Sequence, residues 1–348
     1  MARTDHYAVL LAINYYPGLR NLDGPENDIE AFERWLKSSN GGDVDPANIK
    51  VIRSSDYRPP ATDPNDANPT ERAFIKVLDS WVRIDRTTWK ERVGERLYVY
   101  MAGHGFTAGS SINDPALFSA VAQIGDTAHI AGYRYVSRIA NAGFFDEIVL
   151  VMDCCQDVLK ASQVLDPTWS PPDRGASGNV KVLQAYGAPR GEAAFESADE
   201  EGVKRGFFSR VFISALETAL ADAQGSVTGT ALKGQFLQLW NDQYSSQTGY
   251  DPPIHLPAGH DIQLYRRTAA PPAGAGGATV TFTLCVPVPV NSIVLVQRGA
   301  GNPPIATLSA DATMEVSLTP GIYKAVLAGT SRQKLFEVLD SGRTRVEI

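Results

Sequence analysis

Short apolar runs ended by turn-type residues alternate with amphipathic stripes over the first three quarters of the chain. The first run, residues 7–14, is almost continuously apolar, the pattern of a strand buried on both faces. Further strands of this kind are expected at residues 49–52, 97–102, 148–152, 180–185 and 262–265. Apolar residues at helical spacing predict helices at about 25–36, 70–81, 133–142, 208–219 and 232–240. Strands that alternate with helices indicate right-handed β-α-β units, and thus an α/β fold with a mainly parallel six-stranded sheet flanked by helices.

The pattern changes after residue 267. Residues 268–278 are an uncharged Ala/Pro/Gly stretch, which is typical of an interdomain linker. Beyond it, apolar and polar residues alternate with a period of two, as in Val280, Phe282, Leu284 and Val286. This alternation predicts roughly six short antiparallel strands and a small all-β sandwich at 279–348. We therefore expect a catalytic-type α/β domain at 1–267 and a β domain that offers a surface to a protein partner.

Composition narrows the classes of function. The 348 residues carry a formal charge of -7 with a pI near 5.3, which argues against nucleic-acid binding because that function normally needs a basic face. No apolar run reaches the about 18 residues that span a membrane, and no charged-then-apolar leader precedes the first strand. These features predict a soluble, cytoplasmic protein without nucleic-acid or membrane partners. Three cysteines, Cys154, Cys155 and Cys285, are too few for a disulfide framework, and Cys285 lies in an alternating β pattern that favours packing.

Reactive side chains follow the predicted strands where each strand ends. His104 comes after strand 97–102, Cys155 comes after strand 148–152, and Asp28 lies in the first turn of the helix after the first strand. Ligands of open α/β sheets gather at the carboxyl ends of the strands, so we expect these three groups to face one crevice. A thiol beside an imidazole has the nucleophile and the proton carrier of covalent catalysis. The N–H groups of Gly105 and Cys155 are the expected donors to a tetrahedral oxyanion.

Three motifs give the chain a resemblance to the caspase/metacaspase family over about residues 5–266. Metacaspases carry a strand ending in Ile-Asn-Tyr-Tyr followed by Leu-x-Gly-x-x-Asn-Asp, which 13–16 and 22–28 resemble. Their Gly-His-Gly element is similar to 103–105, and the first half of their Asp-x-Cys-His-Ser-Gly element is similar to 153–155. The 51 residues between His104 and Cys155 (155 − 104) also fit the roughly fifty of caspases.

The resemblance implies a caspase-like fold and a role for each matched residue. It makes Cys155 the nucleophile, His104 its base and Cys154 a buried neighbour. It places Asp28 and Asp153 in an acidic S1 pocket, which implies cleavage of protein or peptide substrates after Arg or Lys, because paired carboxylates suit a guanidinium. The expected function is therefore that of a cysteine endopeptidase with a His-Cys dyad and no cofactor or metal. Calcium is left open as an activator.

Residues 156–158, Gln-Asp-Val, replace the family's His-Ser-Gly, and this departure keeps a second hypothesis in place. In that hypothesis the chain is a catalytically silent caspase-like module that binds a partner through the same crevice. The polar segment 166–178 has the composition of an exposed processing loop. Arg174 in that segment, Arg190 and Arg205 are candidate self-cleavage sites if the pocket accepts basic residues.

Each of the four candidate side chains also has a purely structural interpretation. His104 could be a turn histidine and Cys155 a core thiol. Asp28 could favour the start of a helix, and Asp153 could cap the end of a strand. The Gly103-x-Gly105-x-x-Ala108 spacing also fits a loose dinucleotide fingerprint, although the residues after it oppose the helix that such a site needs. His255 and His260 lie near Asp261 among prolines, and we expect them to be surface loop residues rather than metal ligands.

Overall fold

The computed structural model describes residues 2–108, 114–160, 162–199, 202–222, 224–257 and 261–267, and then seven strand segments between 278 and 347. Its centre is a six-stranded sheet in the order β13-β9-β7-β3-β1-β2. The strands are β1 (His6–Ala12), β2 (Ile49–Arg53), β3 (Gly94–Ala102), β7 (Phe145–Asp153), β9 (Lys181–Tyr186) and β13 (Ile254–His255). All neighbouring pairs are parallel except β13 with β9. The predicted α/β fold with a mainly parallel six-stranded sheet is therefore confirmed.

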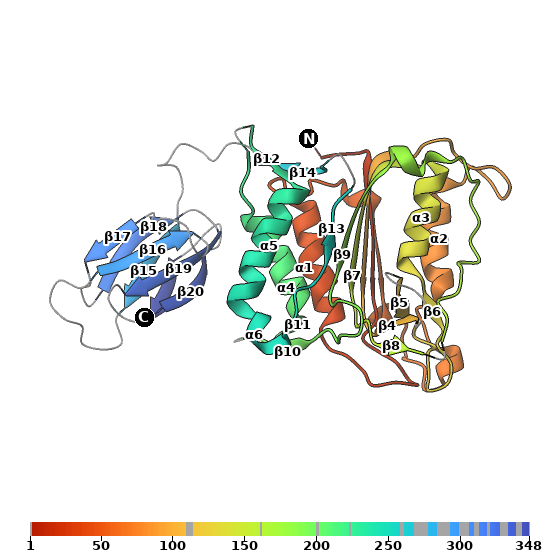
Figure 1. Cartoon of the computed structure of the whole chain (residues 1–348), viewed down its shortest axis with the longest axis horizontal. Helices are drawn as coiled ribbons and strands as arrows, with labels where there is room; N and C mark the ends of the chain where they lie inside the picture. Colours follow the sequence, from red (N-terminus) through yellow and green to blue (C-terminus); the bar gives the residue numbers. More distant parts are fainter. Residues whose placement is uncertain are drawn as a thin grey trace.

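Helices cover both faces of this sheet (Figure 1). One face carries α1 (Pro25–Lys37), α4 (Phe207–Thr218) and α5 (Gly229–Gln243), and the other carries α2 (Glu71–Val82) and α3 (Gly132–Ala142). Alternate residues of each strand serve opposite faces. Leu10 packs into the core under the first group of helices, whereas Val9 and Leu11 pack under the second. Both faces are buried, which explains why the strands read as unbroken apolar runs.

The start of α1 follows from its sequence. Pro25 occupies the first turn, where a missing N–H costs nothing, and Glu26 and Asp28 lie there as acidic residues that favour the positive end of the helix dipole. The side chain of Asn14, which follows β1, accepts a hydrogen bond from the N–H of Glu26 at 3.0 Å. The chain leaving β1 is thus fixed to the helix that carries Asp28.

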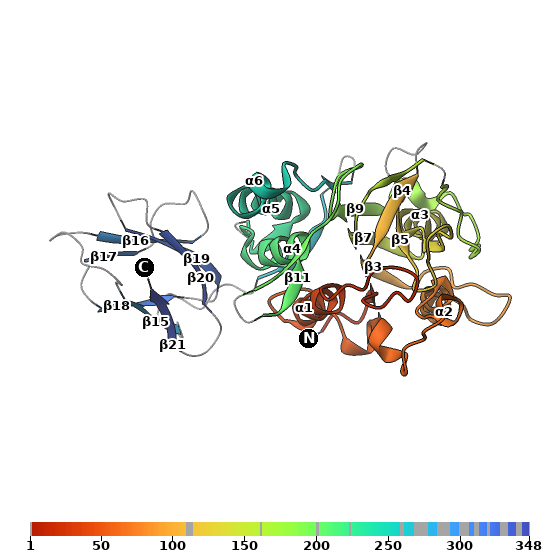
Figure 2. The same ribbon diagram turned by 90° about the horizontal axis from the view of Figure 1, so that it is seen from below.

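Small sheets flank the carboxyl ends of the central strands (Figure 2). A four-stranded sheet joins β6 (His129–Ile130), β5 (Pro115–Phe118), β4 (Gly105–Ala108) and β8 (Val158–Leu159), and a hairpin joins β10 (Glu196–Ala198) to β11 (Lys204–Gly206). Figure 2 places β11 on the side of α1 and α4, and β4 and β5 on the side of α3. The carboxyl edge is therefore enclosed from two sides. The described chain also contains short helical turns, namely η1 (Pro46–Asn48), η2 (Ser54–Asp56), η3 (Pro64–Asp66), η4 (Ala176–Asn179) and α6 (Ser245–Thr248).

The prediction that the last strand belongs to the central sheet is wrong. Residues 263–266 do form a strand, β14, but it pairs antiparallel with β12 (Ser226–Thr228) outside the central sheet. The sixth strand of the sheet is the two-residue β13, where His255 is exposed. His255 is thus a surface residue, as predicted, although it lies on a strand rather than in a loop, and His260 lies outside the described residues.

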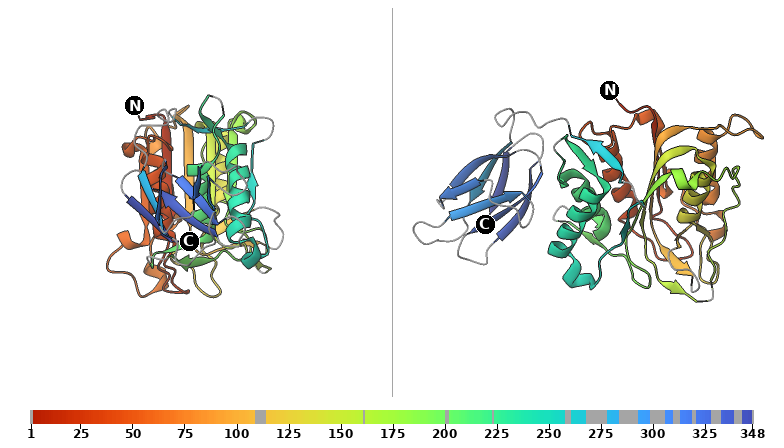
Figure 3. Two further views of the ribbon diagram at one scale, coloured as in Figure 1. Left: turned by 90° about the vertical axis from the view of Figure 1, so that its left-hand side faces the viewer. Right: turned by 45° about the horizontal axis from the view of Figure 1, so that its top comes forward.

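The C-terminal segments form two further sheets (Figure 3). One has the order β18-β15-β21 and the other β17-β16-β19-β20. Their bounds are β15 (Ala278–Thr283), β16 (Ile293–Arg298), β17 (Ala306–Ser309), β18 (Thr313–Leu318), β19 (Gly321–Leu327), β20 (Gln333–Val338) and β21 (Arg343–Glu347). These seven described strands exceed the roughly six expected, and β15 pairs with β21 in parallel rather than antiparallel. Residues 268–277 of the predicted linker 268–278 lie outside the described residues, as do Leu284, Cys285 and Val286, and Ala278 is the first residue of β15. The domain boundaries stay predictions. Among the helices that are described, none has the length and apolar character needed to cross a membrane.

Candidate active site

Two neighbouring strands end at the same level at the carboxyl edge of the sheet. The register of β3 and β7 pairs Ala102 with Asp153, and the N–H of Gly103 donates to the carbonyl of Asp153 at 3.3 Å. His104 lies two residues beyond Ala102, and Cys155 lies two residues beyond Asp153. Neighbouring strands are about 4.8 Å apart, so the structure places both residues at adjacent strand ends.

The imidazole of His104 is held by a backbone carbonyl. Its Nε2 lies 2.7 Å from the carbonyl oxygen of Arg20, in the turn that follows β1. A carbonyl only accepts hydrogen bonds, so this contact assigns the ring hydrogen to Nε2. Nδ1 is then the nitrogen with a free lone pair, and it is the atom that can take a proton from a thiol.

The thiol of Cys155 is half-buried beside the segment after β9. The N–H of Ala194 donates to its Sγ at 3.3 Å, and Sγ lies 3.8 Å from the carbonyl oxygen of the same residue. Burial raises the pKa of the Cys155 thiol, and the carboxylates of Asp157 and Asp153 raise it further, whereas the Ala194 N–H acts in the opposite direction. The resting group is therefore a neutral thiol, which needs a base before it can act as a nucleophile.

His104 and Cys155 keep separate partners in this structure. Among the described residues, no hydrogen bond joins the two side chains: Nε2 of His104 faces Arg20, and Sγ of Cys155 faces Ala194. The arrangement supplies a base with the correct free nitrogen and a thiol at the next strand end. The two side chains are therefore close in the fold but are not joined by a hydrogen bond.

Gly105 lies close to Cys154 and to the backbone of Cys155. Gly105 begins β4, and a Cβ at this position would lie 2.6 Å from Sγ of Cys154 and 2.8 Å from the carbonyl oxygen of Cys155. Only glycine fits such a close approach. Cys154 itself is buried, and burial raises the pKa of its thiol far above the ordinary value, which makes it an inert neighbour. The oxyanion role of the Gly105 and Cys155 N–H groups stays a prediction.

The two predicted pocket acids converge on one glycine. The N–H of Gly206, at the end of β11, donates to both carboxylate oxygens of Asp28 at 3.2 and 3.0 Å. Asp153 accepts from the backbone N–H of Ser209 at 3.2 Å and from its hydroxyl. A Cβ on Gly206 would collide with Asp153 and lie 3.2 Å from Asp28. The structure therefore brings Asp28 and Asp153 together around Gly206.

These carboxyl groups lie in an environment that opposes negative charge. Asp28 is 2% exposed and Asp153 is 7% exposed. Burial raises the pKa of Asp28 well above its usual range and the charge of Asp153 adds to this, while burial raises the pKa of Asp153 to about 6. Two carboxylates that are buried together repel each other. The charges of Arg205 and Arg210 partly offset this for Asp28, but among the described residues no ion pair joins a cation to either acid. A cationic side chain placed between them would relieve that repulsion.

A comparison with protein-family models identifies the family of this chain. Residues 5–233, more than half of the chain, match the family model described as Caspase domain. This chain belongs to the caspase-domain family. Family and fold together support a function of the cysteine-peptidase type.

Solved structures with the caspase fold are distant in sequence. Caspase-1 from Spodoptera frugiperda is 12% identical, with a TM-score of 0.48, over 77% of this chain and 93% of that chain. The structure of pro-sf-caspase-1 is 12% identical, with a TM-score of 0.37, over 77% of this chain and 94% of that chain. No curated protein matches the sequence.

In this caspase-domain chain, the residues that follow Cys155 are held by hydrogen bonds and strand pairing. Gln156 is buried, its N–H donates to the carbonyl of Glu192 at 2.9 Å, and its carbonyl accepts from Gly191 at 2.9 Å. Its side-chain Nε2 donates to the carbonyl of Ala188 at 2.6 Å. Val158 then starts β8, which pairs with β4. The departure from His-Ser-Gly thus builds a regular connection from Cys155 to residues 188–192.

The three candidate self-cleavage arginines lie in different surroundings. Arg174 donates to the carbonyls of Lys90, Glu91 and Ala142. Arg190 donates to the hydroxyl of Thr107 at 3.2 Å and the carbonyl of Ala108 at 2.9 Å. Arg205 lies on β11 beside Gly206, and its charge acts on Asp28.

The segment 166–178 is only partly the exposed loop that its composition predicts. Trp169 is buried, and its indole N–H donates to Asp79 at 2.9 Å. Asp173, Arg174 and Gly175 are exposed. Trp169 therefore anchors the segment against α2, while Asp166, Thr168 and Ser170 around it are exposed.

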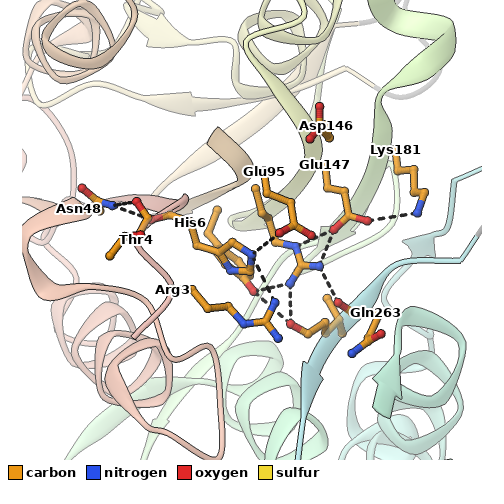
Figure 4. A network of polar contacts seen from close by, with 12 residues as sticks. Arg3, Thr4, His6, Asn48, Glu95, Asp146, Glu147, Lys181 and Gln263 are labelled. Carbon is orange, nitrogen blue, oxygen red and sulfur yellow. Dashed lines mark hydrogen bonds and ion pairs between the residues drawn. The ribbon is translucent and has the colours of Figure 1, made fainter. Parts of the chain in front are cut away.

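The opposite end of the same strands carries a cluster of charged groups (Figure 4). Asp5, His6 and Glu95 each offer a metal-ligating atom, and these atoms lie within 4.8 Å of one another. However, burial lowers the pKa of His6, and the positive charges of Arg96 and Arg3 act in the same direction, so that the pKa falls to about 3. Two guanidinium groups beside the imidazole also oppose a metal cation.

The side-chain motifs did not predict the backbone groups that contact the candidate catalytic side chains. The carbonyl of Arg20 and the N–H of Ala194 contact the two reactive side chains, yet any residue type could supply them. Tyr16 was part of a predicted motif without a role of its own. Its hydroxyl accepts a hydrogen bond from the N–H of His104 at 3.1 Å.

Proposed function

We propose that this caspase-domain chain is a cysteine endopeptidase that cleaves peptide bonds after Arg or Lys through His104 and Cys155. The observation that carries the proposal is the pair of buried carboxyl groups, Asp28 and Asp153, at the edge of the sheet where His104 and Cys155 also lie. A basic P1 side chain would supply the cation that this pair lacks. Arg would engage it through a bidentate fork and Lys as a point charge.

The reaction follows from the protonation states of the two groups. Nδ1 of His104 takes the thiol proton, and the sulfur of Cys155 attacks the carbonyl carbon to give a tetrahedral oxyanion. The N–H groups of Gly105 and Cys155 are the proposed donors to that oxyanion. The C–N bond then breaks as the imidazolium gives its proton to the leaving amine, which leaves a thioester. Water then attacks the thioester as His104 takes a proton from it. The C–S bond breaks, the carboxylic acid product is released, and the imidazolium returns the proton to the sulfur of Cys155.

Substrate entry requires a change at β11. The N–H of Gly206 occupies Asp28, and the N–H and hydroxyl of Ser209 occupy Asp153. A P1 guanidinium would replace the Gly206 contact as β11 moves outward. The pocket of this structure is thus closed, and opening it is part of the proposed cycle.

Self-processing belongs to the same proposal. Arg205 is the favoured site because it directly precedes Gly206 and acts electrostatically on Asp28. Arg190 and Arg174 are weaker sites because several carbonyl or hydroxyl groups hold each of them. Mass spectrometry of purified chain should find a cut after Arg205 that is absent in Cys155→Ala. Intact chain in both preparations would remove self-processing.

A silent module is the second candidate, because residues 188–194 lie along Gln156 and against Cys155. In that case the crevice would bind a partner without turnover. The deciding experiment compares fluorogenic peptides ending in Arg, Lys or Asp, with and without calcium, for wild type and Cys155→Ala. Turnover of the Arg and Lys peptides by wild type alone supports the peptidase. Absence of turnover with all three peptides in both conditions supports the silent module.

Covalent labelling tests the nucleophile and pocket together. An Arg-based inhibitor that reacts with cysteine should modify Cys155 in wild type, and peptide mapping identifies the site. Asp28→Asn should reduce the labelling rate, whereas a matched inhibitor ending in Asp should react slowly with both proteins. Equal rates with the Arg and Asp inhibitors would exclude a basic P1 preference.

A further inference from the structure

One short turn contacts His104 on both its backbone and its ring. Residues 16–21 follow β1 and contain Tyr16, whose hydroxyl meets the His104 N–H at 3.1 Å, and Arg20, whose carbonyl meets Nε2 at 2.7 Å. The rings of Tyr16 and His104 also pack, with centroids 5.0 Å apart. The position of the imidazole therefore depends on a segment about 85 residues earlier in the chain.

The Tyr16 hydroxyl stands where a sheet hydrogen bond would otherwise form. Beyond the antiparallel pair Gly105–Leu117, His104 and Phe118 are the next opposite residues. Such a pair normally exchanges two N–H···O bonds. Here the Phe118 N–H donates to the His104 carbonyl at 2.8 Å, but the His104 N–H donates to Tyr16, whose hydroxyl reaches the Phe118 carbonyl at 3.4 Å. The hydroxyl is inserted into the ladder and separates His104 from β5 on one side.

The surrounding residues fit this insertion. Gly103 has a φ of 153°, and a Cβ at this position would collide with the Tyr16 hydroxyl. Tyr16 is 1% exposed, and burial raises the pKa of its phenol, so the hydroxyl stays neutral and can both donate and accept. The site is thus shaped for one hydroxyl group.

Asn21 closes the turn. Its Oδ1 accepts a hydrogen bond from the backbone N–H of Tyr16 at 2.9 Å, and the N–H of Leu19 donates to the Tyr16 carbonyl at 3.2 Å. These two bonds fix the loop between Tyr16 and Asn21 and so direct the Arg20 carbonyl at Nε2. Asn21 is exposed, so its side chain can be changed without disturbing a core.

We propose that Tyr16 and Asn21 are positioning residues for His104, which hold the imidazole with its hydrogen on Nε2 and leave Nδ1 free to accept a proton. The inference rests on the proposed peptidase function, because it explains how the base of that reaction is oriented. Neither side chain touches the reacting atoms. Both act through the backbone of His104 or through the Arg20 carbonyl.

The first test removes only the hydroxyl. Tyr16→Phe should lower kcat on an Arg peptide by about 10- to 100-fold with KM within about twofold of wild type, because misplacement of a base affects the transition state and not substrate binding. The matched control is Tyr135→Phe, which deletes the hydroxyl of another fully buried tyrosine, bound at 2.6 Å to Glu71. Its kcat should stay at the wild-type value. An equal fall in both variants, or a rise in KM alone for Tyr16→Phe, would overturn the proposal.

A second test uses an exposed residue and a rescue. Asn21→Leu removes the acceptor for the Tyr16 N–H and should lower kcat, whereas Asn21→Asp keeps an acceptor oxygen and should restore most of it. Loss of activity in both variants, with unchanged melting temperatures, would show that Asn21 acts in another way.

Nitrogen NMR of histidine-labelled protein separates this inference from the peptidase proposal, because it needs no turnover. Wild type should show His104 as the Nε2–H tautomer with slow hydrogen exchange, and Tyr16→Phe should show faster exchange at that position. If wild type cleaves no peptide but this difference is present, the positioning holds and the proposed function fails. If wild type is active and both proteins give the same His104 signals, the positioning is refuted and the function stands.

Discussion

The two ends of β3 and β7 treat charge in opposite ways. At the amino ends, Arg96 lies opposite Glu147 and donates to it, and Arg96 also donates to the carbonyls of Gln263 and Leu264. Figure 4 labels Glu147 and Gln263 of this network. At the carboxyl ends, the two acids Asp28 and Asp153 are met by neutral N–H and hydroxyl donors. The first end has compensated charge and contributes to stability. The second end holds two buried acids whose raised pKa values oppose their ionisation, so a cationic ligand would be favoured beside them.

The pKa shifts at the two ends carry opposite signs. The pKa of His6 is lowered to about 3, so the unfolded chain binds more protons and stability is lost as the pH falls from about 6.5 toward 3. The pKa of Asp153 is raised to about 6, so the native protein binds more protons and stability is lost as the pH rises from about 4 to 6. Low pH therefore lowers the stability contributed by the amino ends through His6 and raises that contributed by the carboxyl ends through Asp153.

Breaking the compensated end should have the largest effect on stability. Arg96→Met leaves the Glu147 carboxylate and two carbonyls without their buried donor, and we expect a loss of about 3–5 kcal/mol in the free energy of unfolding. Urea denaturation measures it. Arg92→Met is the matched control, because Arg92 also pairs with an acid on β7, Asp146, but both side chains are more than half exposed. That control should change stability by less than about 1 kcal/mol, and equal losses would contradict the comparison.

Removing an acid from the carboxyl ends of the strands should change the pH dependence of stability instead. A pKa raised from about 3.9 to about 6 makes up to about 3 kcal/mol of stability disappear between pH 4 and 6, and Asp153→Asn should remove that loss. Because the His6 window overlaps with opposite sign, the informative quantity is the difference between the wild-type and variant unfolding curves. That difference should grow with pH in favour of the variant. Asp146→Asn, on the same strand but exposed, should track wild type, and a flat difference for Asp153→Asn would refute the assignment.

Sequence patterns located the strand ends better than the contacts around them. Residues 97–102 and 148–152 are apolar on both faces because helices cover both sides of the sheet, so their ends and the neighbouring positions of His104 and Cys155 could be predicted. The pairing of residues 263–266 could not be, because an apolar alternation identifies a strand without identifying its partner. β13 is only two residues long, too short for any periodicity.

The same limit applies within the candidate site. Asp28 and Asp153 were found through a motif that names side chains. The Arg20 carbonyl and the Ala194 N–H are backbone atoms, and their placement depends on how turns fold rather than on residue type. Gln156 was noticed only as a departure, and its three hydrogen bonds to residues 188–192 need the segment after β9 to lie beside it.

The neutral hydrogen bonds at the carboxyl ends of the strands should each contribute less than the ion pair at the amino ends. Gln156→Leu leaves the buried Ala188 carbonyl without a donor, and we expect a loss of about 1–3 kcal/mol. Gln247→Leu is the control, because Gln247 is exposed and its 3.4 Å bond to the Gln243 carbonyl is weak; it should stay within about 0.5 kcal/mol of wild type. Urea denaturation reads both. No difference between the two variants would mean that Gln156 does not hold residues 188–192.

Lys181, the most exposed residue of the charged network at the amino ends, should have the smallest effect on stability. Comparing it with Arg96 shows how much burial contributes. Nζ of Lys181 lies 3.2 Å from Oε1 of Glu147, but its side chain is 38% exposed, whereas that of Arg96 is 1% exposed. Water and salt screen the Lys181 charge, so Lys181→Gln should cost less than about 1 kcal/mol. The difference should vanish at about 1 M salt, where the Debye length falls to about 3 Å. Arg96→Met should keep its penalty in that salt, because the Arg96–Glu147 pair is enclosed by protein. A loss for Lys181→Gln that is as large as that of Arg96→Met, and as insensitive to salt, would mean that closeness to Glu147 rather than burial makes this end of the strands rigid.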